Sequence, residues 1–256
     1  DTMAALHFAR AGSEPIAAVI NAEPSSSARE ADIVLPIMAG TEIGVASTKA
    51  FVAQLMVLAG LAVLAGRERG HVSATQEREM TDTLSGLPAA LSAVLACEPA
   101  LKALAQDLSG ARSILYIGRG LMYPMALEGA LKLKELTYIH AEGYAAGELK
   151  HGPIALIDDD VPVVVLAPDD RLLDKTVSNL QEVIARKGRV ALLGDEAALH
   201  RVGLGIWRAV SLPRTERFPA PIVYAIAVQL IAYHTAVAKG TDVDQPRNLA
   251  KSVTVE

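Results

Sequence analysis

The sequence has one cysteine, few aromatic residues and nothing that resembles a signal peptide. Cys97 is the only cysteine among 256 residues, which excludes an internal disulfide and a cysteine metal site. Aromatic residues make up 4% of the chain, too few for the stacking platforms of single-strand-binding proteins. The net charge of −5 argues against nucleic acid or an anionic membrane as the main partner. We therefore expect a protein of the reducing cytoplasm.

Long apolar runs and the common cofactor motifs are also missing. The longest apolar run, 51–66, contains a glutamine and falls short of the roughly 20 residues that a membrane span needs. The chain has no HExxH, no metal-spaced His/Asp cluster and no GxSxG. The stretch "GRGLMYPMALEG" (118–129) lacks the third glycine spacing of a dinucleotide fingerprint, and its glycines favour a tight strand-to-helix turn. We expect no membrane, no metal and no cofactor.

What the sequence does contain is a series of short segments rich in Val, Ile and Leu. Each is flanked by Gly, Pro or Asp, and helical patterns lie between most of them. This alternation predicts an α/β fold with mostly parallel sheets flanked by helices. The expected strands are 15–20, 32–37, 113–118, 161–167, 189–194 and 209–213.

The chain also repeats itself weakly. Residues 1–21 align with 174–195, and 31–62 align with 207–238, which indicates two copies of one α/β unit. The second copy is preceded by a strand–helix–strand segment (113–167) that the first copy lacks. We therefore expect the first domain to be truncated at its N-terminus by about 60 residues, the extent of that extra segment. The alternative is that the first unit is minimal by nature.

These patterns divide the chain into four parts. The first domain is expected at 1–66 and the second at 111–240, with a connector of two or three helices at 67–110. A tail, 241–256, ends the chain with the unusually specific stretch "DQPRNLAKSVTVE".

A charged stripe lies on the helix predicted to begin near residue 128. At 100° per residue, Glu128, Lys132 and Glu135 fall on one face of that helix, among leucines. One interpretation is a ladder of ion pairs on an exposed face, which contributes a few tenths of a kcal/mol. The other is a carboxylate base held near a lysine at the rim of a pocket.

Two loops offer further candidate groups. His151 lies in "AAGELKHGP", where glycines and a proline let the backbone approach a ligand and a histidine could move protons near neutral pH. In "GTEIGVASTKAF" (40–51), Ser47 and Thr48 precede a helix, where hydroxyl and N–H groups suit a phosphate or a sugar. Plain helix capping by Ser47 or Thr48 is an equally good interpretation.

Three long stretches, 40–51, 128–158 and 239–256, carry a resemblance that extends over nearly the whole chain. They resemble the isomerase half of the glutamine–fructose-6-phosphate aminotransferases (glucosamine-6-phosphate synthases), which consists of two sugar-isomerase (SIS) domains. The resemblance implies conversion of fructose 6-phosphate and ammonia to glucosamine 6-phosphate through a lysine Schiff base and a carboxylate-mediated proton transfer between C1 and C2.

The resemblance also implies roles for single residues. Glu135 would be the isomerisation base with Lys132 beside it, His151 would open the sugar ring, and Lys251 would form the Schiff base. Val45 and Ala250 would contact the sugar through backbone atoms. The other residues expected near the sugar are Glu42, Ser47 and Arg247, the last as a support for the tail.

Partners follow from the same resemblance. His151 would reach the site of a second subunit, so a homodimer is expected. Ammonia would come from a glutaminase domain upstream, since these residues contain no such domain and Cys97 lies in the connector. Two alternatives stay open: a stand-alone SIS sugar-phosphate deaminase or isomerase, and a non-catalytic SIS module that senses sugar phosphates.

Overall fold

The computed structural model describes residues 2–12, 15–22 and 25–251, which form two compact units. The first comprises Asp1–Ile43 and Ser47–Thr81, and the second comprises Gly44–Ala46 and Asp82–Glu256. The predicted tail extends past the described residues at 252–256. The domain boundaries inferred from the sequence stay predictions.

The first unit is built on two parallel strands. β1 (Ala17–Ile20) pairs with β2 (Ile33–Pro36), with Ala17 opposite Ile33. Both strands lie within segments expected from the sequence. The helices of this unit are α1 (Thr2–Arg10), α2 (Ser26–Glu30), α3 (Lys49–Glu68) and the first turns of α4 (Ala74–Ser85).

The second unit contains a five-stranded sheet in which every pair is parallel. The strand order is β4-β3-β5-β6-β7. The strands are β3 (Ser113–Gly118), β4 (His140–Ala145), β5 (Pro162–Leu166), β6 (Arg189–Gly194) and β7 (Arg208–Ser211). The helices are α5 (Leu87–Ala96), α6 (Glu98–Leu108), α7 (Met122–Thr137), α8 (Leu173–Ile184), α9 (Glu196–Val202) and α10 (Ala220–Lys239). The α/β fold with parallel sheets is confirmed, and α4, α5 and α6 supply the predicted connector helices.

The sequence did not predict strand β4. Its residues, "HAEGYA", contain no apolar run, and the strand lies at the edge of the sheet, where it pairs with β3 alone. An edge strand needs fewer apolar side chains than a central one, so the pattern that revealed the other strands is missing. Two 3₁₀ helices, η1 (Ala146–His151) and η2 (Pro153–Leu156), follow it where a loop was expected.

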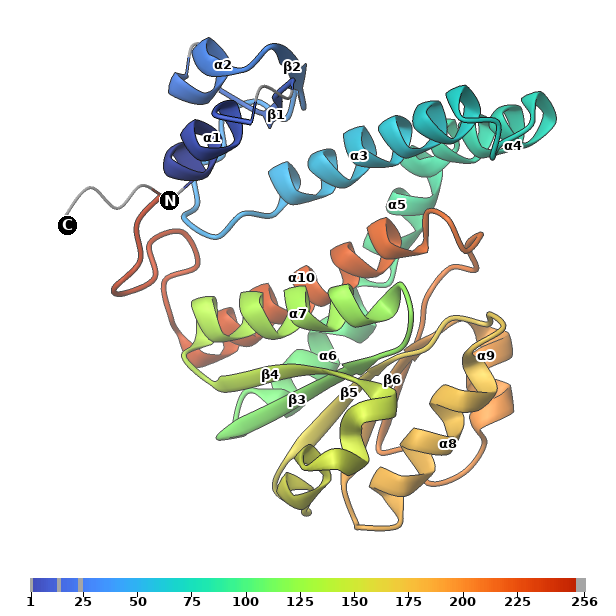
Figure 1. Cartoon of the computed structure of the whole chain (residues 1–256). Helices are drawn as coiled ribbons and strands as arrows, with labels where there is room; N and C mark the ends of the chain where they lie inside the picture. Colours follow the sequence, from blue (N-terminus) through green and yellow to red (C-terminus); the bar gives the residue numbers. More distant parts are fainter. Residues whose placement is uncertain (1, 13–14, 23–24, 252–256) are drawn as a thin grey trace. The chain divides into compact units, whose positions relative to one another are not determined.

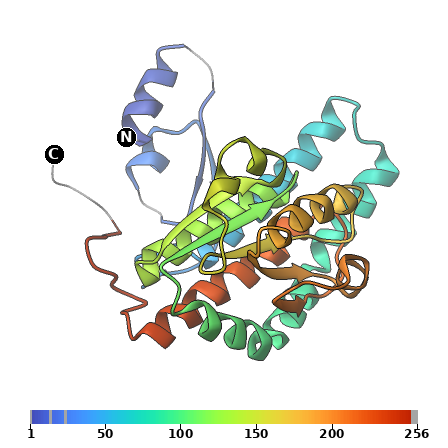
Figure 2. The same cartoon turned by 90° about the horizontal axis from the view of Figure 1, so that it is seen from below.

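The second unit has three layers (Figure 1, Figure 2). Helices α7 and α10 lie side by side on one face of the sheet, where Tyr116 of β3 packs against Gly129 of α7. Helix α8 and η1 cover the other face, with a core that includes Leu115, Val165 and Leu180. Because alternate strand residues point to opposite faces, the central strands are buried on both sides, as their continuous apolar runs predict.

A tight turn joins β3 to α7. A Cβ on Gly118 would overlap the Met122 carbonyl oxygen, and Gly120 has a φ of +57°. Other residues would clash or be strained at these positions. The prediction that these glycines form a strand-to-helix turn is confirmed, and the turn fixes where α7 begins.

Two helices, α3 and α10, are each 20 residues long and apolar enough to cross a membrane by length and composition alone, and the bent run from Ala74 to Leu108 would add a third. The sequence prediction cited a glutamine in the longest apolar run and a length below about 20 residues; the length is wrong, because both helices reach 20 residues. Of the apolar windows, 72% of α10 is buried in the protein but only 17% of α3. The apolar character of α10 is therefore explained by its packing against α7 and α6.

Candidate functional site

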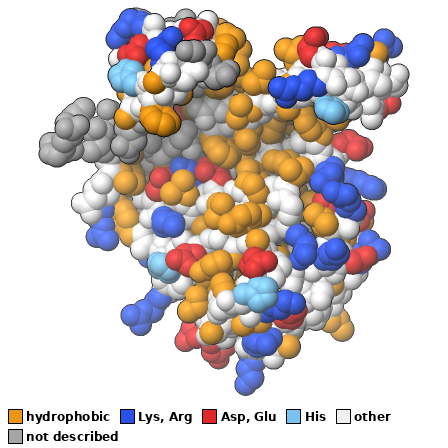
Figure 3. Space-filling view, in the orientation of Figure 1, with side chains coloured by type: hydrophobic (Ala, Val, Ile, Leu, Met, Phe, Trp, Pro, Cys, Tyr) orange, Lys and Arg blue, Asp and Glu red, His pale blue; other side chains and the backbone are white. Residues whose placement is uncertain are grey.

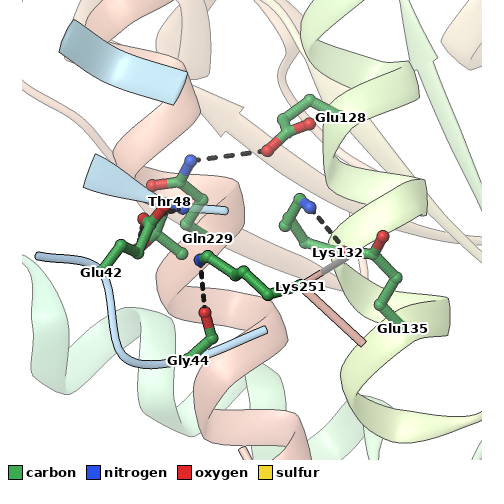
Figure 4. A network of polar contacts seen from close by, with 8 residues as sticks. All are labelled: Glu42, Gly44, Thr48, Glu128, Lys132, Glu135, Gln229 and Lys251. Carbon is green, nitrogen blue, oxygen red and sulfur yellow. Dashed lines mark hydrogen bonds and ion pairs between the residues drawn. The ribbon is translucent and has the colours of Figure 1, made fainter. Parts of the chain in front are cut away.

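The charged stripe of α7 is buried. Glu128 and Lys132 are 7% and 4% exposed, and Lys132 Nζ lies 2.6 Å from Glu135 Oε2 (Figure 4). The Glu135 side chain is 22% exposed. An ion-pair ladder on an exposed face is thereby excluded, and the stripe is instead a buried ammonium between two carboxylates, one of which reaches the surface.

Glu128 lies deeper, between α7 and α10. The side-chain amide of Gln229 on α10 donates a hydrogen bond to Glu128 Oε1 at 3.5 Å. Burial raises the pKa of Glu128 to about 7, and the attraction of Lys132 and the Gln229 hydrogen bond only partly oppose this. Glu128 therefore changes protonation near neutral pH, and this changes the electrostatic field at the nearby Lys132–Glu135 pair.

Because its pKa is raised, the ionised form of Glu128 lowers the free energy of unfolding of the protein. The unfolded carboxyl ionises above about pH 4.5 and the folded one above about pH 7, so stability falls as pH rises through that interval. Glu128→Gln removes this loss. We expect the free energy of unfolding of the variant, relative to wild type, to be about 2 kcal/mol larger at a pH of about 8 than at a pH of about 5. This is somewhat less than the full pKa shift corresponds to, because the attraction of Lys132 is also lost.

Urea unfolding of both proteins at the two pH values measures this gain. Glu182→Gln, at a partly exposed position on α8, is the control and should show no such pH-dependent difference. An equal effect of pH on wild type and Glu128→Gln would contradict the assigned ionisation.

The tail is held against the second unit by hydrogen bonds. The Thr241 hydroxyl donates to the Leu136 carbonyl oxygen at 2.6 Å, next to the end of α7. The Asp242 carboxylate accepts from the N–H groups of Gln245 and Asp244, which lower its pKa. These contacts fix the tail's departure from α10.

Further along, the tail meets the segment Gly44–Ala46. The Val45 N–H donates to the Asp244 carbonyl oxygen at 2.9 Å. Lys251 Nζ donates to the Gly44 carbonyl oxygen at 2.6 Å (Figure 4). Val45 and Lys251, two predicted site residues, are thus placed by the same segment. Ala250 is exposed and directly precedes Lys251.

Tyr138 joins the tail to the end of α7. It caps the helix in a left-handed conformation with a φ of +61°, its hydroxyl accepts the Arg247 N–H at 2.9 Å, and the Arg247 guanidinium lies 4.2 Å from its ring centroid. A side chain at positive φ is strained unless its surroundings hold it there. The Arg247 guanidinium therefore stacks on an aromatic ring rather than pairing with a carboxylate, and its role as a support for the tail stays a prediction.

Removing the Tyr138 side chain should loosen the tail. We expect Tyr138→Phe to speed amide hydrogen exchange at Arg247 by about fivefold, since one hydrogen bond contributes about 1 kcal/mol. Tyr138→Ala also removes the stacking and should speed it a few-fold more. Hydrogen-exchange mass spectrometry of the tail peptide measures this, with the exposed Tyr123→Phe as the control. Wild-type exchange in Tyr138→Ala would show that Tyr138 does not hold the tail.

The loop before α3 belongs to the first unit, apart from the segment Gly44–Ala46. There the Glu42 carboxylate accepts from the Thr48 N–H at 2.8 Å (Figure 4). It also accepts from the Ala50 N–H at 3.4 Å. Glu42 therefore caps α3. Thr48 occupies the N-cap position without a side-chain capping bond, so the hydroxyl cap considered for it is not formed. Ser47 is partly buried just before it.

His151 lies at the other end of the sheet from Glu135. It ends η1, which follows the carboxyl end of β4, whereas α7 runs back from that edge and reaches Glu135 near its last turn. His151 is 62% exposed, and its Nδ1 lies 2.8 Å from Glu148 Oε2. Within one chain the structure does not bring His151 to the Lys132–Glu135 pair.

Two contributors to the site were missed by the reasoning from sequence. Gln229 reaches Glu128 from a largely apolar helix, and Tyr138 contacts Arg247 from a helix end. A lone polar residue in "AVQLIAY" was the available hint for Gln229. Across the described parts of the chain, no group of three or more His, Cys, Asp or Glu residues could hold a metal ion.

Comparison with known proteins assigns the family. The family model of the SIS domain matches residues 1–64 and 107–239, most of the chain. The chain belongs to the SIS domain family. The two matched segments correspond to the two copies found as an internal repeat.

Close relatives among SIS proteins cover the chain from end to end. It is 58% identical over 256 residues to the glutamine–fructose-6-phosphate aminotransferase (isomerizing) of Zymomonas mobilis, and 55% identical over 257 residues to one from Rhizobium meliloti. The chain spans 42% of the length of each.

Solved SIS structures show the same fold. The C-terminal domain of glucosamine-fructose-6-phosphate aminotransferase from Francisella tularensis matches with a TM-score of 0.87 and 44% identity, over 90% of this chain and 64% of that one. A phosphosugar isomerase structure from Clostridium difficile, 21% identical, matches with a TM-score of 0.77 over 95% of this chain and 68% of that one, and supports the fold alone.

Proposed function

We propose that this chain is the isomerase part of a glutamine–fructose-6-phosphate aminotransferase, which converts fructose 6-phosphate and ammonia to glucosamine 6-phosphate. The observation that carries the proposal is the 58% identity over the whole chain to a relative of that name. The buried Lys132–Glu135 pair and the nearby tail that carries Lys251 add support, because this chemistry needs a carboxylate base and an amine.

The proposed reaction begins when His151 assists ring opening of the sugar. Lys251 Nζ then adds to the C2 carbonyl carbon and water leaves, giving an imine; ammonia displaces the lysine from C2. The carboxylate of Glu135 takes a proton from C1 and returns it to C2. The C1 hydroxyl gives up its proton and becomes the aldehyde, while the C2 imine nitrogen gains a proton and becomes the amine. Lys132, 2.6 Å from Glu135, holds that carboxylate in place between the two transfers.

The remaining predicted residues would surround the substrate. Val45 and Ala250 would offer backbone atoms to the sugar hydroxyls, and Arg247 would keep the tail in place through Tyr138. Ser47 and Glu42 are assigned to the sugar by the family resemblance alone. None of these roles requires a metal or an organic cofactor.

The assembly around this part is also a proposal. His151, remote from Glu135 along its own chain, would serve the site of a second copy, so the active form is a homodimer. An upstream glutaminase domain would supply ammonia, in keeping with relatives of which this chain covers 42%. The family resemblance favours a cytoplasmic enzyme that needs neither membrane nor nucleic acid.

The full-length protein should form glucosamine 6-phosphate from fructose 6-phosphate and glutamine, and glucosamine 6-phosphate production can be followed by chromatography. A protein that needs no glutamine and instead releases ammonia from glucosamine 6-phosphate would be a deaminase, and the proposed function would be wrong.

A further inference from the structure

The second unit contains a hollow that the proposed reaction does not use. Its volume is about 500 Å³, within the range of small-molecule sites. Three short segments border it, and each follows a strand. They are Leu121–Met122 after β3, Pro168–Arg171 after β5, and Arg214–Arg217 after β7. Ala220, the first residue of α10, completes the wall.

The hollow lies at the point where the order of the strands in the sheet reverses. From β3 the chain passes to β4 on one side, whereas β5, β6 and β7 follow in order on the other side. The switch point is therefore between β3 and β5, and two of the three segments leave the carboxyl ends of these strands. Open parallel sheets bind ligands in the crevice at this position.

This position is remote from the Lys132–Glu135 pair. Helix α7 begins at Met122, in the wall of the hollow, and reaches Glu135 thirteen residues later, a rise of about 20 Å at 1.5 Å per residue. The tail docks at Tyr138, still further along the helix. The hollow and the proposed catalytic groups are two separate places in one unit.

Two arginines at the hollow have no partner. Arg171 and Arg217 are exposed, and no described residue forms a hydrogen bond or ion pair with either guanidinium. Arg214 is different, since Asp169 lies 3.6 Å from it and 3.7 Å from Arg201. Lys and Arg side chains gather on the flank of Figure 3 where Figure 1 places the starts of α7 and α10. A planar guanidinium matches a phosphate with two parallel hydrogen bonds, so these arginines suit a phosphate group.

The rest of the lining suits hydroxyl groups. Asp170, Glu216 and Thr215 line the hollow together with the arginines. Asp170 is held in place, because its Oδ1 accepts the Leu172 N–H at 2.7 Å, and its other oxygen can still accept. Carboxylates and a hydroxyl beside unpaired arginines match a ligand with hydroxyls at one end and phosphate at the other.

We propose that this hollow is a second ligand site, separate from the catalytic groups, for a phosphorylated sugar or sugar alcohol. Arg171 and Arg217 hold its phosphate, and Asp170 and Glu216 accept hydrogen bonds from its hydroxyls. The site stands independently of the imine chemistry assigned to Lys251.

The test uses the full-length protein and glucitol 6-phosphate, which has no carbonyl to react with a lysine. Phenylglyoxal labels accessible arginines, and peptide mass spectrometry reports the labelling of each. We expect the probe to protect Arg171 and Arg217 but not Arg112, an exposed arginine that precedes β3 at the opposite edge of the sheet. Unphosphorylated glucitol should not protect, and inorganic phosphate should protect more weakly.

Calorimetric titration supplies a second measurement. Wild type should bind two equivalents of glucitol 6-phosphate per chain, one in the hollow and one at the catalytic groups. Arg171→Ala with Arg217→Ala should weaken one equivalent by roughly tenfold for each arginine removed, whereas Arg112→Ala should weaken neither. If the proposed catalytic function failed, the wild-type count would be one, and that one would still depend on Arg171 and Arg217.

Three results would overturn the proposal. They are absence of protection at Arg171 and Arg217 by millimolar probe, equal protection by inorganic phosphate, and binding in the double variant that matches wild type. Thermal unfolding of the double variant checks that both proteins are folded. If it does not fold, the labelling of wild type decides the question by itself.

Discussion

Lys251→Ala should abolish the formation of glucosamine 6-phosphate, with a loss of roughly a thousandfold or more, the scale expected when an enzyme loses its covalent nucleophile. The fold should be unaffected. Lys251 is exposed, and the tail keeps its bonds at Thr241, Asp244 and Arg247 when the Lys251–Gly44 contact is lost. Steady-state rates with fructose 6-phosphate and glutamine measure the loss.

Two further variants test whether Lys251 acts by forming an imine or only through its positive charge. Lys251→Arg keeps the positive charge and can still reach a carbonyl oxygen, but its guanidinium does not form an imine, so it should be as inactive as Lys251→Ala. Lys102→Ala removes an exposed lysine on α6 and should leave the rate unchanged. Substantial activity in Lys251→Arg would mean that the lysine acts as a charge.

Glu135→Gln should lower the rate of isomerisation by about 10²–10⁴-fold, the range for loss of a general base. Glutamine keeps the shape of the side chain and can still accept a hydrogen bond from Lys132, but it cannot take a proton from C1. The loss should therefore fall on kcat, with a small effect on KM for fructose 6-phosphate.

Exchange of the C1 proton with solvent, followed by NMR, tests the same step without the overall reaction. It should disappear in Glu135→Gln and persist in Glu182→Gln, whose partly exposed carboxylate lies on α8. Persistent exchange in Glu135→Gln would move the role of base to another group, and Glu128, with its pKa of about 7, would be the first to examine.

Reasoning from the sequence predicted the elements whose residues follow a clear strand or helix pattern. The central strands are continuous apolar runs between turn residues, and the stripe of Glu128, Lys132 and Glu135 follows from helical geometry. Strand β4 was missed because an edge strand of polar residues lacks that pattern. The spacing could not show whether the charged stripe was buried, since burial depends on α10, where Gln229 lies 101 residues after Glu128 in the chain.

The parts of the site that the sequence could not predict depend on tertiary contacts. Nothing in the residue types marks Tyr138 as the dock for Arg247 or Gln229 as the partner of Glu128. Nor does the pattern show that Glu42, rather than a neighbouring hydroxyl, caps α3. Each of these side chains is ordinary in type and gains its role from where the backbone places it.

The most direct test of the account is to trap the imine. The full-length enzyme is mixed with fructose 6-phosphate and borohydride, which reduces an imine to a stable secondary amine, and the labelled peptide is identified by mass spectrometry. We predict a sugar-phosphate adduct on Lys251, lost in Lys251→Ala and retained in Lys102→Ala. An adduct on Lys132 or another lysine, or adduct formation unchanged in Lys251→Ala, would contradict the central assignment.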